Sequence, residues 1–184
     1  MSYSNPLDNL RSVRENEHFV KSNSDALEAM RLRKKAREMG EATGVTDEDL
    51  INHLVELGID VETVRILHLV PMIQVAWANG HIDQEERALI ELAAQGRGVN
   101  ERPKARALLT EMLSRPPTAD LCNTALDFCR LVLTAEGDDG SGIENLQELA
   151  LRVAEAHGGF FGIGAVTDSE RRALEQISER LHRK

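Results

Sequence analysis

The chain has 184 residues, a net charge of −9, 41% hydrophobic residues and only 3% aromatic residues. This length suits one domain with a sizeable core, and the scarcity of aromatic side chains favours an aliphatic core, which helical bundles tolerate better than strand-rich folds. The acidic balance argues against nucleic acid or an anionic membrane as the main partner and permits a cation or a basic protein partner.

The N-terminal part is the one basic region, because residues 1–40 carry a net charge of +2 and the remainder carries −11. Residues 1–22 are polar with little hydrophobic periodicity, which predicts a flexible arm. A helix then begins at Ser24 or Asp25 and ends at Gly40. Its basic run, residues 31–37, is interpreted as a solvated helix face, with a docking patch as the alternative.

A short helix from Thr46 to Gly58 completes the segment 23–59, which we expect to be a helical extension packed on the main bundle. From Asp60 a helical pattern resumes, and Pro71 predicts a break or kink because it lacks an amide hydrogen. The following stretch PMIQVAWA is apolar nearly all round, so we expect it to be buried.

Asn79 and Gly80 close that buried helix, and a new helix begins at Asp83 with Leu89, Leu92 and Ala93 expected to face the core. Three further helices follow, over ERPKARALLTEMLSR, TADLCNTALDFCRLVLTAEG (capped by Thr118) and IENLQELALRVAEAHGG, and TDSERRALEQISERLHRK forms the last one. No stretch of five residues alternates between apolar and polar. The sequence therefore predicts an all-α fold: a compact bundle of seven to eight helices, with residues 60–184 as its main domain.

Location is predicted from the cysteines and the apolar runs. Cys122 and Cys129 are seven residues apart, which on one helix places them about 10 Å apart, too far for a disulfide. Two reduced thiols suit the cytoplasm. No run is long and apolar enough to insert into a membrane, and no signal peptide is recognisable, so we expect a soluble cytoplasmic protein.

One motif occurs twice, as GHIDQEER (residues 80–87) and GAVTDSER (residues 164–171). Each copy predicts a capping box, in which Asp83 or Thr167 accepts from the third backbone amide and the glutamate returns to the amide of the cap. The preceding glycines, at 80 and 164, permit the left-handed turn between helices. This explanation requires no metal.

A calcium loop is the alternative interpretation of the first copy, and its spacing excludes an EF-hand. If Gly80 is position 6 and Glu86 position 12, positions 1 and 3 fall on Val75 and Trp77. Neither side chain can ligate calcium, which requires six to eight oxygens.

The arrangement VAWANGHIDQEER, preceded by LVPMI, resembles the TerB-like domain, the helical family named after tellurite-resistance operon proteins. A weaker second copy, AEAHGG followed by FFGIG and AVTDSER, extends the resemblance over about residues 60–184. The resemblance implies an all-helical bacterial domain associated with metal or stress response. It also implies that acidic residues at the helix turns gather into a cation or partner site.

This chain departs from that pattern where the family has an aspartate before glycine, because Asn79 and His157 stand there. Neutral side chains weaken a site for a hard cation. If a divalent cation binds, its candidate ligands are Asn79, Asp83, Glu86, Asp138, Asp139 and Glu170. The alternative is an acidic, solvated turn.

The function predicted on these grounds is a non-enzymatic helical binding module that takes a protein partner or a divalent cation, in a setting of stress or tellurite resistance. A metal-dependent enzyme that uses the same acidic cluster is the first alternative. An oligomerisation or scaffold role through GGFFGIG, burying Phe160 and Phe161 in a dimer, is the second.

Overall fold

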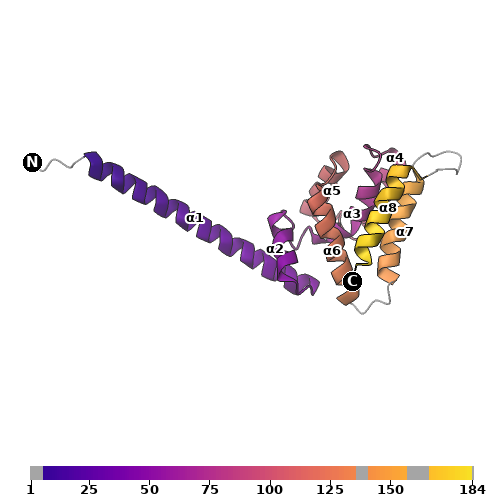
Figure 1. Cartoon of the computed structure of the whole chain (residues 1–184), viewed down its shortest axis with the longest axis horizontal. Helices are drawn as coiled ribbons and strands as arrows, with labels where there is room; N and C mark the ends of the chain where they lie inside the picture. Colours follow the sequence, from indigo (N-terminus) through magenta and orange to yellow (C-terminus); the bar gives the residue numbers. More distant parts are fainter. Residues whose placement is uncertain (1–5, 136–140, 157–165, 184) are drawn as a thin grey trace, which may run out of the picture.

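The computed structural model describes residues 6–135, 141–156 and 166–183. Within these ranges the chain forms eight α-helices and one 3-10 helix, and no described residue lies in a strand (Figure 1). The all-α prediction is therefore confirmed, as is the expected number of helices. None of the helices in these ranges is both long and apolar enough to cross a membrane.

The helices follow one another with short connections. Their bounds are α1 Pro6–Thr43, α2 Glu48–Glu56, η1 Val64–Leu69, α3 Val70–Ala76, α4 Gln84–Gly96, α5 Pro103–Ser114, α6 Ala119–Ala135, α7 Ser141–Ala156 and α8 Asp168–Leu181.

The short helix α3 lies at the centre of the body. Ile73, Val75 and Ala76 have no exposed surface, and α3 packs against η1, α4, α6, α7 and α8, most extensively against α7. A helix that is apolar on all sides is stable only when other elements surround it. The predicted break at Pro71 is present, because the 3-10 helix ends at Leu69 and α3 begins at Val70. Proline is well suited to the first turn of a helix, where its missing amide hydrogen is not needed.

Helix α1 corrects the prediction for the N-terminal segment. The 38-residue helix begins at Pro6, so residues 6–22, expected to be a flexible arm, are helical. Extending an existing helix adds one hydrogen bond for each ordered residue, whereas starting one is costly, and the 24–40 helix supplies the start. Polar composition therefore misled the prediction.

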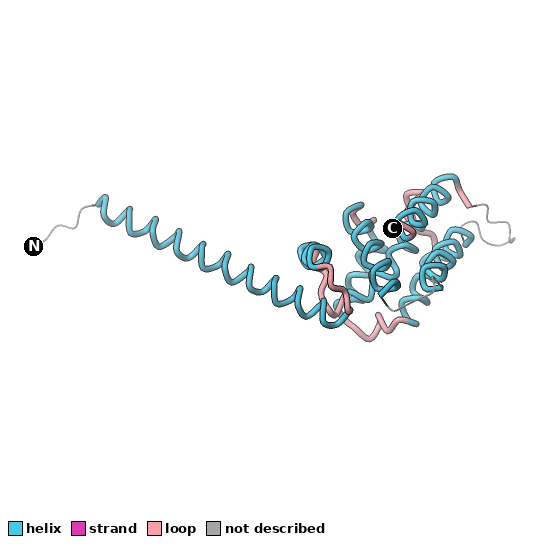
Figure 2. Tube along the Cα trace, turned by 60° about the horizontal axis from the view of Figure 1, so that its bottom comes forward, coloured by secondary structure: helices cyan, strands magenta, loops and turns pink. Residues whose placement is uncertain are grey.

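Most of α1 projects away from the other helices in both views (Figures 1 and 2). Side chains 23–31 are all exposed, Leu32 is the first partly buried one, and Met39 is fully buried. The last turns of α1 pack against α2, and α2 packs against α6. We call residues 6–31 of α1 the arm and all later described residues the body.

Local capping residues begin several helices of the body. Asp47 Oδ1 accepts from the Leu50 amide at 3.0 Å and begins α2, one residue after the predicted Thr46. Thr118 Oγ1 accepts from the Leu121 amide at 3.2 Å at the start of α6, as predicted. Cys122 and Cys129 are both free and buried on that helix, in agreement with the prediction that they do not form a disulfide.

The predicted inward face of α4 is only partly correct. Its fully buried side chains are Glu86, Ile90 and Ala94, whereas Leu92 is 65% exposed. Leu89 and Ala93 are partly buried and pack against the core, so Leu92 is the exposed one of the three predicted residues.

Candidate functional site

The first copy of the repeated motif is a helix connection held by side-chain hydrogen bonds. Asp83 Oδ1 accepts from the Glu86 amide at 2.9 Å, and Glu86 Oε2 accepts from the Asp83 amide at 2.9 Å, which completes the predicted capping box. Gly80 has a φ of 93°, a left-handed conformation that glycine adopts without strain. Asn79 Oδ1 accepts from the His81 amide at 3.2 Å. Each of these side chains thus has a structural role in the turn.

The second copy has the same geometry. Thr167 Oγ1 accepts from the Glu170 amide at 3.2 Å, and Glu170 Oε2 accepts from the Thr167 amide at 2.7 Å. Glu86 and Glu170 both have no exposed surface. The predicted repeat is therefore a repeat of structure as well as of sequence. Gly164 and His157 lie outside the described residues.

The predicted cation ligands are not brought together as far as the structure describes them. Within residues 6–135, 141–156 and 166–183 no three or more His, Cys, Asp or Glu side chains are close enough to hold a metal ion. Asp83 and Glu86 are engaged in one capping box and Glu170 in the other. Asp138 and Asp139 lie outside the described residues, so the complete predicted set stays a prediction.

The two thiols are poorly suited to nucleophilic chemistry. Burial raises the pKa of Cys122 to about 11 and that of Cys129 to about 12, so both are neutral thiols at physiological pH. Cys129 Sγ lies 3.5 Å from the Leu67 carbonyl oxygen, to which it donates. Both cysteines therefore behave as core residues.

A largely apolar concave surface that exposes a large side chain lies between α4 and α7. We call it the α4–α7 groove; it has a volume of about 570 Å³. Its lining residues are Met72, Leu89, Leu92, Ala93, Gly96, Arg97, Asn145, Leu149 and Arg152. Leu92, whose burial the sequence predicted, stands in this groove with 65% of its surface exposed.

Two arginines give the groove a positive edge. Arg97 is partly buried, burial lowers the pKa of its guanidinium, and its Nη1 lies 3.5 Å from the Ala93 carbonyl oxygen. Arg97 has no ion pair among the described residues, whereas Arg152 pairs with Glu148 at 2.6 Å. The surface thus combines an aliphatic floor with a guanidinium that has no carboxylate partner in the described part of the chain.

The sequence did not predict this groove, because Leu89, Leu92 and Ala93 were all expected to face the core. The available signal was the width of the apolar surface, since Leu89, Ile90, Leu92, Ala93 and Ala94 cover more of the helix than one neighbour can bury.

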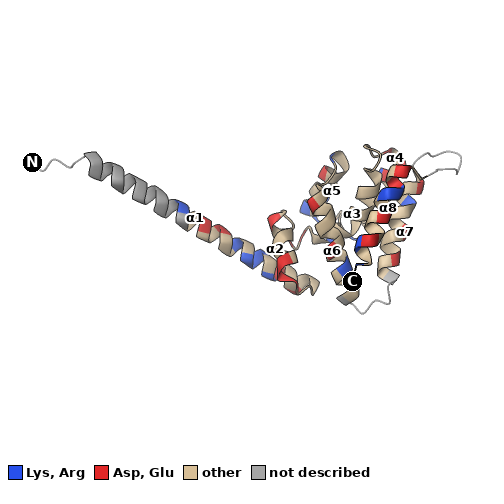
Figure 3. Cartoon of the chain, viewed as in Figure 1, with Lys and Arg blue, Asp and Glu red and all other residues tan. Residues whose placement is uncertain are grey.

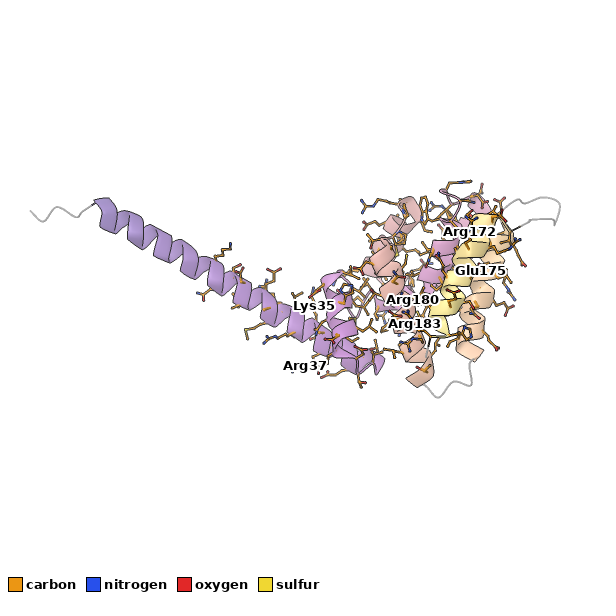
Figure 4. The ribbon with its side chains drawn as sticks, in the orientation of Figure 1. Lys35, Arg37, Arg172, Glu175, Arg180 and Arg183 are labelled. Carbon is orange, nitrogen blue, oxygen red and sulfur yellow. The ribbon has the colours of Figure 1, made fainter. Side chains whose placement is uncertain are left out.

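The exposed arm is a second unusual surface. Leu27 is 56% and Met30 67% exposed, and both precede the basic run 31–37, which appears as a blue cluster just before α1 meets α2 (Figure 3). Lys35 and Arg37 of this run are labelled in Figure 4 near the base of the arm. The basic side chains of the run are all exposed, which agrees both with a solvated face and with a docking patch: Arg31, Arg33, Lys34, Lys35 and Arg37.

Comparison of the chain with protein-family models, with curated proteins and with solved structures finds no match in any of the three.

Proposed function

We propose that this chain is a helical protein-binding module, and that its α4–α7 groove takes an amphipathic helix of a partner protein whose polar side carries carboxylates. The exposure of Leu92 on the aliphatic floor of the groove carries the proposal. A helical body of this kind normally buries such a face, and exposed apolar surface rimmed by polar groups is typical of docking sites.

The shape and chemistry of the floor define the apolar side of the occupant. Leu89, Leu92 and Ala93 lie on α4 and Leu149 on α7, so the floor runs between two helices. A helix placed in such a groove contributes residues at positions i, i+3, i+4 and i+7. Branched aliphatic side chains at those positions would remove Leu92 from water and gain about 25 cal/mol for each Å² of apolar surface that is buried.

Charge defines the polar side of the occupant. The partly buried Arg97 has lost part of its hydration and gains no carboxylate from the described chain. A partner carboxylate beside it would form a charge-assisted hydrogen bond in a partly desolvated place, where such bonds are stronger than at an open surface. The occupant is therefore apolar on one side and acidic on the other.

The TerB-like resemblance is part of the same proposal. A bacterial setting in stress or tellurite resistance is what that resemblance implies, and the resemblance rests on the two motif copies, each of which forms a capping box. A docking role agrees with the resemblance to a family whose helix turns are thought to serve a cation or a partner.

Photo-cross-linking in living cells tests the groove. A photoreactive amino acid at position 92 is expected to give an adduct with one protein. The same photoreactive amino acid at position 27, a leucine on the arm that is 56% exposed against 65% for Leu92, serves as the matched control. A synthetic peptide of the adducted helix should then bind the purified chain, lose binding on Leu92→Glu and weaken on Arg97→Gln and with added salt.

Three outcomes would contradict the proposal. They are no adduct at position 92, equal adducts at positions 92 and 27, and a peptide whose binding is unaffected by Leu92→Glu. An adduct with a second copy of the chain would assign the groove to self-association instead.

A further inference from the structure

The pocket beside the base of α1 has a different chemistry from the groove. It has a volume of about 320 Å³, and residues from α1, η1, α6 and the connections around them line it: Ala42, Thr43, Val61, Val64, Arg65, His68, Arg102, Phe128 and Val132. Three of these residues are basic and none is acidic, although the whole chain carries a net charge of −9.

Both arginines of the pocket are available to a ligand. Neither the Arg65 nor the Arg102 guanidinium makes a hydrogen bond or an ion pair with any residue that the structure describes. The acidic residues nearest to Arg65 along the chain are engaged elsewhere, because Lys104 pairs with Asp60 at 3.4 Å and with Glu62 at 3.0 Å. Guanidinium groups bind carboxylates and phosphates through paired, directed N–H donors.

The third basic residue, His68, is fixed against the core. Its ring meets the ring of Phe128 edge to face, with centroids 6.4 Å apart, and its Nδ1 lies 3.9 Å from Cys129 Sγ. Burial, helped by the positive charge of Arg97, lowers the pKa of His68, so the imidazole is neutral at physiological pH. A neutral imidazole supplies a hydrogen bond without adding charge.

The remaining wall of the pocket includes apolar residues. Val61 and Val132 provide partly exposed aliphatic surface next to the two arginines, and the buried side chains of Val64 and Phe128 lie behind it. Small-molecule sites are typically concave and of this size, with a few precisely placed polar groups that fix the orientation of the ligand. The combination fits a ligand with one anionic end and a compact apolar end.

We propose that this pocket binds a small organic anion, with its carboxylate or phosphate held by Arg65 and Arg102 and its apolar part against Val61 and Val132. Because the ligand rests on Ala42 and Thr43 as well, it connects the end of α1 to η1 and α6. This site is separate from the α4–α7 groove in its lining residues and does not depend on the proposed function.

Isothermal titration of the full chain with phenyl phosphate, benzoate and neutral benzyl alcohol tests the pocket. The two anions are expected to bind and the alcohol is not, and Arg65→Gln and Arg102→Gln should each weaken anion binding about tenfold or more. Arg172→Gln is the matched control, since Arg172 is an exposed arginine on α8, far from the base of α1 (Figure 4). The Arg172→Gln variant should bind both anions with the same affinity as the unchanged chain.

The proposal is overturned if neither anion binds, if benzyl alcohol binds as well as the anions do, or if Arg172→Gln weakens binding as much as the two pocket substitutions. Circular dichroism melts of all three variants show whether each one is folded. These outcomes are independent of the cross-linking at position 92, so the two proposals fail separately.

Discussion

The arm and the body of this molecule are both helical, but different forces hold their helices. In the arm, side chains 23–31 are exposed, so its helix relies on backbone hydrogen bonds and local propensity. In the body, α3 has side chains such as Ile73 with no exposed surface, and packing makes the helix stable. Helix α1 belongs to both regions, so one continuous helix can have two ends that differ in stability.

The largest expected effect is in the core of the body. Ile73→Ala should reduce the free energy of unfolding by about 2–5 kcal/mol, because it removes buried methyl groups and leaves a cavity. Leu27→Ala in the arm should change it by less than about 0.5 kcal/mol, since Leu27 is 56% exposed. Urea denaturation followed by circular dichroism measures both changes. Equal losses in the free energy of unfolding would contradict the difference between arm and body.

The two capping boxes of the body come next. Asp83→Ala and Thr167→Ala should each lower the free energy of unfolding by about 0.5–2 kcal/mol, because each leaves a first-turn amide of α4 or α8 without its acceptor. The same denaturation experiment measures the loss. If both residues serve only as helix caps, the two substitutions should lower the free energy of unfolding by similar amounts. No loss of stability for Asp83→Ala would mean that Asp83 has another role.

A pair of exposed alanines sharpens the comparison of arm and body. Ala88→Gly in α4 should lower the free energy of global unfolding by about 1 kcal/mol, the propensity difference within a helix. Ala29→Gly in the arm should reduce helical circular dichroism and leave the global midpoint unchanged, because the arm unfolds locally. If Ala29→Gly shifts the midpoint as much as Ala88→Gly does, arm and body unfold as one unit.

The attachment of α2 to α6 should depend on pH. His53 Nε2 lies 3.0 Å from Asp120 Oδ1, and this hydrogen bond, together with the negative charge of Asp120, raises the pKa of His53 above its ordinary value of 6.5. The pair therefore stabilises the fold below pH 6.5 and loses that contribution as pH rises through the higher folded-state pKa. Asp120→Asn should lower the melting temperature more at pH 5.5 than at pH 8.5. An equal fall in melting temperature at both pH values would contradict a stabilising interaction between His53 and Asp120.

The smallest expected effect concerns the acidic turns of the body. Millimolar calcium, magnesium or manganese should leave the melting temperature unchanged, since Asp83, Glu86 and Glu170 are engaged in capping boxes. A cation that binds only the folded chain would stabilise it by about 2.7 kcal/mol at a hundredfold excess over its dissociation constant. A shift of that size would support the predicted set that includes Asp138 and Asp139.

The sequence by itself determined the helices of the body and several of their starts. Asp83, Thr118 and Thr167 were predicted as caps because a cap acts on amides two or three residues away, which is a local property. The sequence also predicted the repeat of the capping box, the burial of α3 and the absence of a disulfide between the two cysteines. The helical state of residues 6–22 was not, because it depends on extension from a neighbouring helix.

Tertiary structure alone decided which surfaces stay open and which distant residues meet. Leu92 is exposed and Ile90 buried on the same helix, and only the positions of the neighbouring helices distinguish them. His53 meets Asp120 across 67 residues of chain, and Arg65, Arg102 and Phe128 line one pocket from three separate segments. The periodicity of a segment predicts that one face of its helix is apolar. Which other helix covers that face depends on packing between distant segments, which the local sequence does not encode.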